Sequence, residues 1–167
     1  KASVDTGVRR FVYSSSSSVY GDISKLPQKE DSETNPMSPY GAQKLYGEIL
    51  CKTFSTVYNI ETISLRYFNV YGEKQNLSGT YATVIGIFLN QLKNNQPLTI
   101  NGNGEQLRDF TYVGDVVRAN ILASKSKKVG NGEVINIGSG KNISINSIAN
   151  IIGKSFKYMP AVKEPFA

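Results

Sequence analysis

Short β-prone runs alternate with amphipathic stretches of about ten residues along this chain of 167 residues. Strands are expected at residues 8–14, 61–68, 97–101, 110–113 and 133–137, and helices from Pro39 onward and over residues 81–93, 115–123 and 145–152. Strands that alternate with helices of this length are typical of a mainly parallel sheet, because each parallel connection needs a crossover element. We therefore predict an α/β fold without internal repeats of fixed period.

One helix has a well-defined start in the sequence. Ser38 suits the N-cap, where a hydroxyl accepts a backbone hydrogen bond, and Pro39 suits the first helical position, where its missing N–H is not needed. An apolar stripe at helical spacing follows, made of Leu45, Ile49, Phe54 and Val57. The pattern predicts an amphipathic helix.

The composition excludes several classes of function. The chain contains no His, which excludes a His-dependent triad, a His general base and a His-rich metal site, and we expect no metal. Its single Cys cannot form an internal disulfide and favours a reducing compartment, so we expect a cytoplasmic protein. No stretch approaches the ~18 apolar residues that a membrane-spanning helix needs, so we expect no membrane partner.

Basic residues outnumber acidic ones, with 19 Lys and Arg against 13 Asp and Glu and a formal net charge of +6. Such an excess can mark a nucleic-acid-binding surface. Here the charges are scattered, and the small clusters at residues 9–10 and 125–128 lack the interleaved aromatic residues of a single-strand-binding surface. We expect no nucleic-acid partner, whereas a small polyanion such as a nucleotide diphosphate fits the same excess.

Five consecutive serines occupy residues 14–18. A serine run of this kind is often a flexible linker. Its flanks, residues 11–13 and 19–21, are apolar and β-prone, which instead places the run at the C-terminal end of a strand. Ligands of open α/β sheets bind outside those strand ends, where small hydroxyl side chains can approach them closely. The run is therefore a candidate site.

Tyr40 and Lys44 are four residues apart at the start of the predicted helix, so they lie on one face, one turn apart. An ammonium group on the next turn favours the phenolate form of a tyrosine. The pair can thus take and return a proton near neutral pH. The same spacing occurs by chance in many chains, and a packed tyrosine beside a surface lysine is the alternative interpretation.

Four ordered motifs give this spacing a context. They are F-V-Y-S-S-S-S-S-V-Y-G at residues 11–21, S-P-Y-G-A-Q-K at 38–44, L-R-Y-F-N-V-Y-G at 65–72 and G-N-G-E-Q-L-R-D-F-T-Y-V at 102–113. Together they resemble the extended short-chain dehydrogenase/reductase family and, within it, the NAD-dependent epimerases and dehydratases of sugar nucleotides, most closely those typified by UDP-glucose 4-epimerase. The resemblance runs nearly from end to end.

This resemblance implies a fold and a division into domains. We expect residues 1–75 to form the rear half of a Rossmann-like, doubly wound NAD-binding domain. Residues 76–167 would then form mainly a smaller substrate domain, with elements that return to the sheet. No G-x-G-x-x-G turn is present in the sequence, and family members carry roughly a hundred residues, including that Gly-rich βαβ unit, before the first strand found here. We therefore expect the middle and rear of an epimerase, inactive alone and a homodimer at full length.

The resemblance also implies roles for particular residues. The catalytic residues would be Ser16, Tyr40 and Lys44. The residues beside the NAD cofactor would be Ser14, Tyr40, Lys44, Tyr67 and Phe68. The residues that hold the UDP-sugar would be Ser16, Tyr40, Asn69, Thr83, Val84, Thr99, Ile100, Asn101 and Arg108. For two of these, an alternative remains open: Asn69 can cap a turn, and Arg108 can pair with Asp109 on the surface.

The implied reaction is epimerisation at C4 of a UDP-hexose, UDP-glucose to UDP-galactose, through a 4-keto intermediate. Dehydratases of the family place Asp-Glu after the catalytic Thr, whereas Ser17 and Ser18 stand here, and this difference favours epimerisation. An epimerase of UDP-glucuronate is an alternative, and residues 79–85 resemble epimerases that also accept N-acetylhexosamines. A non-catalytic binding or regulatory protein on the same scaffold is a further alternative.

Overall fold

A computed structural model describes residues 1–22, 26–77, 79, 82–153 and 155–161, and the described chain falls into two compact units. The first unit holds residues 1–68 and 115–137, and the second holds residues 69–114 and 138–161. The chain thus leaves the first unit after Phe68 and returns to it at Asp115. The predicted domains, residues 1–75 and 76–167, refer to the NAD-binding and substrate domains of the whole protein, and this division stays a prediction.

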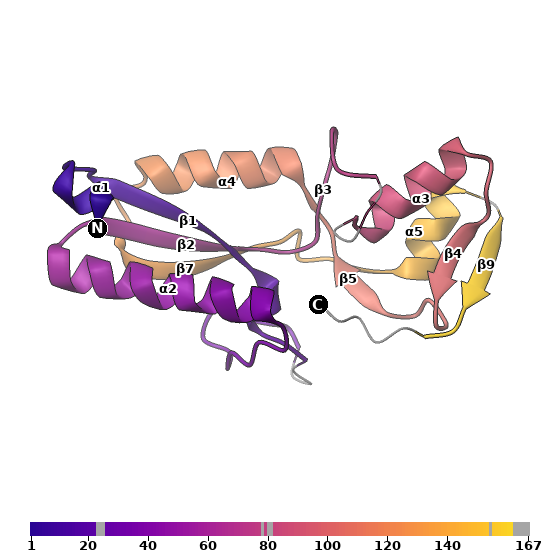
Figure 1. Ribbon diagram of the computed structural model, residues 1–167, viewed down its shortest axis with the longest axis horizontal. Helices are drawn as coiled ribbons and strands as arrows, with labels where there is room; N and C mark the ends of the chain where they lie inside the picture. The colour runs from indigo at the N-terminus through magenta and orange to yellow at the C-terminus, as the bar shows by residue number, and fades with distance from the viewer. Residues whose placement is uncertain (23–25, 78, 80–81, 154, 162–167) are drawn as a thin grey trace. The chain divides into compact units, whose positions relative to one another are not determined.

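A parallel three-stranded sheet forms the centre of the first unit. Its strands are β1 (Arg10–Ser16), β2 (Glu61–Tyr67) and β7 (Asn131–Ile137), in the order β1-β2-β7. Helix α2 (Pro39–Tyr58) covers one face and α4 (Val113–Lys125) the other (Figure 1). Residues 62–66 of the central strand are all buried, as expected for a strand covered on both faces. The short helix α1 (Ala2–Asp5) precedes the sheet.

Helix α2 begins as predicted but buries a different face. The Ser38 hydroxyl accepts a hydrogen bond from the Gly41 N–H at 3.0 Å, which confirms the N-cap. The predicted apolar stripe is wrong in part, because Ile49 is 54% and Val57 63% exposed. The buried positions of the helix are Gly41, Glu48 and Cys51. The helix therefore faces the sheet with a charged residue in the middle.

Several element boundaries also differ from the prediction by one to three residues. β1 extends to Ser16, because its ladder with β2 pairs Ser16 with Tyr67. Helix α4 begins at Val113, so Asp115 lies in its first turn instead of capping it. Helix α5 (Ile145–Ile152) has the predicted bounds, and the Ser144 hydroxyl caps it by accepting the Ser147 N–H at 3.1 Å.

The second unit contains α5, α3 (Val84–Lys93) and six short strands. The strands are β3 (Val70–Tyr71), β4 (Leu98–Asn101), β5 (Leu107–Asp109), β6 (Thr111–Tyr112), β8 (Asn142–Ser144) and β9 (Phe156–Met159). They pair as β3-β6 and β4-β9 in parallel and as β5-β8 antiparallel. An apolar cluster is the core of this unit: Phe88, Leu98, Ile100, Phe110, Ile145, Ile148 and Ala149. No helix within the described ranges is both long and apolar enough to cross a membrane.

Candidate functional site

The C-terminal end of β1 turns directly into a single 3₁₀ turn, η1 (Ser17–Val19). Ser16 joins the two elements, and its hydroxyl accepts hydrogen bonds from the Ser18 N–H at 3.2 Å and from the Ser18 hydroxyl at 3.0 Å. The serine run is therefore ordered secondary structure at a strand end, and the linker interpretation is wrong.

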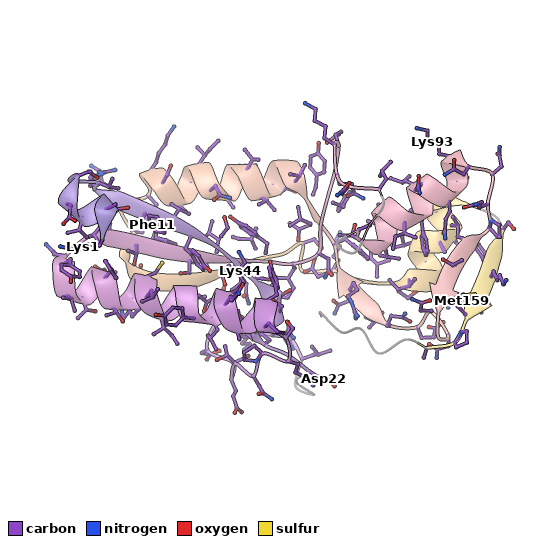
Figure 2. The ribbon with its side chains drawn as sticks, in the orientation of Figure 1. Lys1, Phe11, Asp22, Lys44, Lys93 and Met159 are labelled. Atoms are coloured by element: carbon purple, nitrogen blue, oxygen red, sulfur yellow. The ribbon has the colours of Figure 1, made fainter. Side chains whose placement is uncertain are left out.

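The first turn of α2 packs against this strand end. A Cβ atom at Gly41 would lie 2.7 Å from the Ser18 carbonyl oxygen, so only a glycine permits this approach. Lys44, labelled in Figure 2, donates a hydrogen bond to the Ser14 carbonyl at 2.9 Å. Its ammonium nitrogen lies 5.4 Å from the centre of the Tyr40 ring, and Tyr40 is 46% exposed. The structure thus places Ser16, Tyr40 and Lys44 on packed neighbouring elements.

A second set of contacts lies on the α4 face of the same strand ends. The Ser14 and Tyr67 hydroxyls are 3.1 Å apart, and the Tyr67 hydroxyl is 3.0 Å from the side-chain oxygen of Asn120. Phe68, the next residue after Tyr67, instead contacts Tyr20, with 6.3 Å between the centres of the tilted rings. Asn120 was not predicted from the sequence, because nothing in the residues around it distinguishes it from a solvent-exposed asparagine on a helix.

A buried ion pair lies beneath the site. Glu48 and Arg66 are joined by two hydrogen bonds of 2.9 and 2.7 Å, and each side chain is 5% exposed. Burial opposes the charge on Arg66, but the bonds to Glu48 outweigh burial and raise its pKa. The Ser15 hydroxyl also donates to Glu48. The pair was missed although a signal exists: Glu48 follows Leu45 and precedes Cys51 at helical spacing, and Arg66 interrupts a β-prone run.

Tyr20 connects this ion pair to β7. The Arg66 guanidinium carbon lies 4.6 Å from the centre of the Tyr20 ring, and the Tyr20 hydroxyl donates to the Asn136 side chain at 2.7 Å. Burial raises the pKa of the Tyr20 phenol, although Arg66 acts in the opposite direction. This phenol is a structural hydrogen-bond donor, which leaves Tyr40 as the exposed phenol at the strand end.

The residues at the strand ends fit one end of a dinucleotide. An ammonium has three donors, and Lys44 uses one of them on Ser14, so its chemistry suits the two hydroxyls of a ribose. The hydroxyls of Ser14 and Ser16 add small polar groups that a ligand can approach closely. Contact of these residues with the nicotinamide ribose of NAD stays a prediction.

The residues expected near the sugar-nucleotide diphosphate belong to the second unit. The Asn69 side-chain N–H donates to the Asp109 carbonyl at 3.0 Å, and the Asn69 carbonyl accepts from the Thr111 N–H at 3.3 Å. Both contacts join Asn69 to the segment around β5 and β6, which is distant in the sequence, so neither is the cap of a local turn. Arg108 is half-buried in β5 and donates to the Leu107 carbonyl at 3.0 Å. Their contact with a diphosphate stays a prediction.

The other predicted substrate residues also lie in the second unit. Thr83 is the N-cap of α3 and Val84 is its first residue. The Thr99 hydroxyl accepts from the Gln91 side chain at 2.7 Å, and Ile100 is a core residue that is 1% exposed. Asn101 ends β4 and is exposed. The neighbouring Thr80 and Tyr81 lie outside the described residues.

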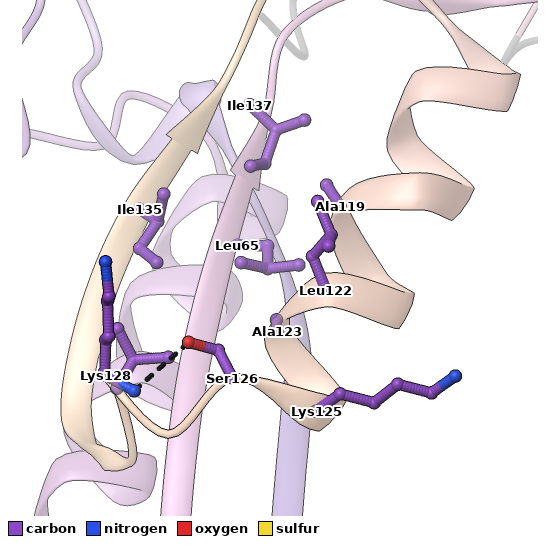
Figure 3. Close-up of a pocket in the computed structure, with 10 residues that line it drawn as sticks. Leu65, Ala119, Leu122, Ala123, Lys125, Ser126, Lys128, Ile135 and Ile137 are labelled. Carbon is purple, nitrogen blue, oxygen red and sulfur yellow. Dashed lines mark hydrogen bonds between the residues drawn. The ribbon is translucent and has the colours of Figure 1, made fainter.

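An apolar groove of about 560 Å³ lies between α4 and the sheet of the first unit (Figure 3). Leu65 of β2, Ile135 and Ile137 of β7 and Leu122 of α4 contribute to its walls. None of the predicted site residues lines this groove. The candidate site is therefore the polar strand end and not this apolar groove.

Comparisons with known proteins agree with this arrangement. A model of the NAD dependent epimerase/dehydratase family matches residues 1–138. A provisionally named UDP-glucose 4-epimerase of Methanocaldococcus jannaschii is 46% identical over 139 residues, which cover 83% of this chain and 44% of that protein. The chain thus spans about half the length of the curated relatives it matches.

Two solved structures extend the comparison. A UDP-N-acetylglucosamine 4-epimerase of Methanobrevibacter ruminantium has a TM-score of 0.92 at 36% identity, covering 99% of this chain and 54% of that one. A UDP-glucuronic acid 4-epimerase of Bacillus cereus, in complex with UDP-glucuronic acid and NAD, has a TM-score of 0.81 at 39% identity, covering 93% and 49%. These structures confirm the α/β fold with a parallel, Rossmann-like sheet.

Proposed function

Because this chain belongs to the NAD-dependent epimerase/dehydratase family, we propose that the whole protein inverts C4 of a UDP-hexose, with UDP-glucose and UDP-galactose as the pair it interconverts. NAD is the cofactor of this family. The observation that carries the proposal is the Lys44 ammonium, held against Ser14 and 5.4 Å from the Tyr40 ring at a strand end that also presents Ser16.

The chain's own residues suit the proton half of this reaction. Tyr40 takes the proton of the C4 hydroxyl, Ser16 hydrogen bonds to the same oxygen, and Lys44 stabilises the phenolate. NAD, when bound, would supply the acceptor for the C4 hydride and the donor of that hydride to the other face of the 4-keto sugar. Tyr40 then returns the proton to the C4 oxygen. Proton and hydride both leave and return, so there is no net oxidation.

The residues after Ser16 favour epimerisation over elimination of water. Removal of water needs a group that withdraws a carbon-bound proton and an acid that protonates the leaving hydroxyl. Ser17 and Ser18 occupy the positions where dehydratases of the family carry carboxylates, and the Ser18 hydroxyl is hydrogen-bonded to Ser16. A serine hydroxyl is too weak an acid and too weak a base for either step.

The second unit supplies the residues proposed to hold the nucleotide part of the substrate. Arg108 has a planar fork of donors that suits a diphosphate, and Asn69 adds an amide. The strand residues Thr99, Ile100 and Asn101 would lie along the uridine, and Thr83 and Val84 at the start of α3. We further propose a homodimer that acts in the cytoplasm, where the buried free thiol of Cys51 stays reduced.

The full-length protein tests the proposal directly. It is incubated with UDP-glucose, UDP-N-acetylglucosamine and UDP-glucuronate in turn, and the products are identified by NMR. We expect UDP-galactose from UDP-glucose, inverted at C4, with no net formation of NADH. Accumulation of NADH or a dehydrated sugar, or no product from any of the three, would contradict the proposal.

A second candidate function is epimerisation of an N-acetylated or uronate UDP-sugar. It is favoured by the similarity to the N-acetylglucosamine and glucuronic acid 4-epimerase structures. Faster turnover of UDP-N-acetylglucosamine or UDP-glucuronate in the same assay would establish it. A full-length protein that carries no NAD would instead support the non-catalytic alternative.

A further inference from the structure

We propose that Ser15, Glu48 and Arg66, called here the Ser15–Glu48–Arg66 cluster, are positioning residues that hold the Tyr40–Lys44 pair in its reactive geometry. The proposal rests on the proposed function, since it concerns the orientation of that reaction's proton-transferring residues.

The cluster joins three elements at one point. Ser15 of β1 and Arg66 of β2 are direct neighbours in the parallel ladder, and both side chains hydrogen bond to Glu48 of α2. Ser15 is 2% exposed, and the two charged side chains are 5% exposed. A fully buried charged pair with directional hydrogen bonds fixes orientation more strictly than apolar contact does. The cluster therefore fixes both the rotation of helix α2 about its axis and its position along that axis relative to the two strands.

The hydroxyl of Ser15 does not belong to the strand-end site itself. Successive side chains of a strand point to opposite faces of the sheet. Ser14 contacts Tyr67, which reaches Asn120 of α4, whereas Ser15 contacts Glu48 of α2 on the other face. The middle serine of the strand end thus acts through Glu48.

A short covalent and hydrogen-bonded path leads from the cluster to the reactive pair. Glu48 lies one helical turn after Lys44, and Ser15 is bonded directly to Ser14, whose carbonyl accepts the Lys44 ammonium. The ammonium in turn faces the rings of Tyr40 and Tyr13 at 5.4 and 5.5 Å. A shift of α2 against β1 would change the separation between the ammonium and the Tyr40 phenol.

The chain offers a matched control in Thr62. Its hydroxyl donates to the Cys51 carbonyl of the same helix at 2.8 Å, and Thr62 is also 2% exposed. Ser15→Ala and Thr62→Val therefore each remove one buried hydroxyl between the sheet and α2. Only Ser15 is bonded directly to Ser14, whose carbonyl accepts the Lys44 ammonium. A purely structural role would therefore give the two variants the same effect.

The test measures kcat, KM and the ¹³Cζ chemical shift of Tyr40 in the full-length protein. The chemical shift is measured at one pH by NMR of ¹³Cζ-labelled tyrosine, with Tyr40→Phe to assign the signal, and it reports the position of the Lys44 ammonium, 5.4 Å from the Tyr40 ring. For Ser15→Ala we expect an unchanged NAD content, a KM within about twofold, a kcat lower by about tenfold to a hundredfold and a Tyr40 signal displaced from its wild-type position. Thr62→Val should match the wild type in all four.

The outcomes separate this proposal from the proposed function. An unmoved Tyr40 signal and unchanged kcat in Ser15→Ala, or equal changes in Thr62→Val, would overturn it. If Ser15→Ala does not fold, Glu48→Gln, which keeps an acceptor oxygen, replaces it with the same expected result. If no UDP-sugar is converted by the wild type but the Tyr40 signal still moves only in Ser15→Ala, the proposed function fails and the positioning role stands.

Discussion

The two units of this chain differ in what they bury. Each contains an apolar cluster, around Leu65 in the first unit and around Phe88 in the second. The first unit also buries a charged pair, Glu48 and Arg66, between a helix and a parallel sheet, whereas Asp109, which accepts the hydrogen bonds of a turn in the second unit, is only half-buried. Buried directional bonds thus add to apolar packing in the unit that carries Tyr40 and Lys44.

The comparison shows where geometry is expected to be strict. Proton transfer requires a particular orientation of donor and acceptor. A buried hydrogen-bonded cluster beneath the site would hold the donor and acceptor in that orientation. The nucleotide that Arg108 and neighbouring strand residues are proposed to hold takes no part in the proton transfer, so small shifts in its position should matter less. The following variants test this contrast, from the largest expected effect to the smallest.

Glu48→Ala in the full-length protein should have the largest effect. The variant leaves the Arg66 charge buried without a partner, which should lower the free energy of unfolding by about 3–5 kcal/mol. Urea-induced unfolding measures this loss. In the double variant Glu48→Leu with Arg66→Met, most of the stability should return while activity stays low. A single variant as stable as the wild type would show that the pair is not buried in solution.

Asp109→Asn should have a smaller, local effect in the second unit. The Asp109 carboxylate accepts hydrogen bonds from the Ser139 N–H at 2.8 Å, the Ser139 hydroxyl at 2.6 Å and the Gly140 N–H at 2.9 Å. Loss of the charge should cost about 1–2 kcal/mol and speed hydrogen exchange at the Ser139 and Gly140 amides. Asp115→Asn, at an exposed position of α4, is the control and should leave those amides unchanged.

Ile100→Val tests the apolar core of the same unit. Its side chain is 1% exposed within the core cluster, so removing one methyl should cost about 0.5–1.5 kcal/mol. The KM for the UDP-sugar should not change, because any ligand contact at this position comes from the backbone. A large rise in KM without loss of stability would show that the side chain itself faces the substrate.

Glu133→Gln should have the smallest effect, and it depends on pH. Burial opposes ionisation of Glu133, but the N–H groups of Gly130 and Asn131, at 2.8 and 2.7 Å, outweigh it and lower the pKa below 4.5. A lowered pKa in the folded state stabilises the protein above pH 4.5, and this contribution is lost as the pH falls through the folded value. The stability difference between wild type and variant should therefore shrink on acidification. A difference independent of pH would contradict this.

Local signals in the sequence predicted part of this structure. Ser38 and Pro39 start α2, and the spacing of Tyr40 and Lys44 places them on one helix face, because these relations span a few residues. The family motifs at residues 11–21 and 65–72 identified the fold class and the cofactor.

Contacts between distant residues were not predictable in the same way. An apolar stripe was expected on the buried face of α2, but Glu48 lies on that face. Its charge is tolerated there because Arg66, eighteen residues later in the chain, neutralises it inside the fold. The short strands β5 and β8 pair across more than thirty residues, and neither has a β-prone run long enough to predict a strand. No role was predicted for Ser15, because the direction of its side chain toward α2 depends on where β1 meets its neighbour.

The most direct test of the account compares two tyrosines of one helix. Tyr40→Phe and Tyr46→Phe each remove a phenolic hydroxyl from α2 of the full-length protein, and Tyr46 is 61% exposed. Interconversion of UDP-glucose and UDP-galactose should fall by about two to four orders of magnitude in Tyr40→Phe, with NAD still bound, and stay near the wild-type rate in Tyr46→Phe. Near-normal turnover by Tyr40→Phe would remove Tyr40 from its proposed role.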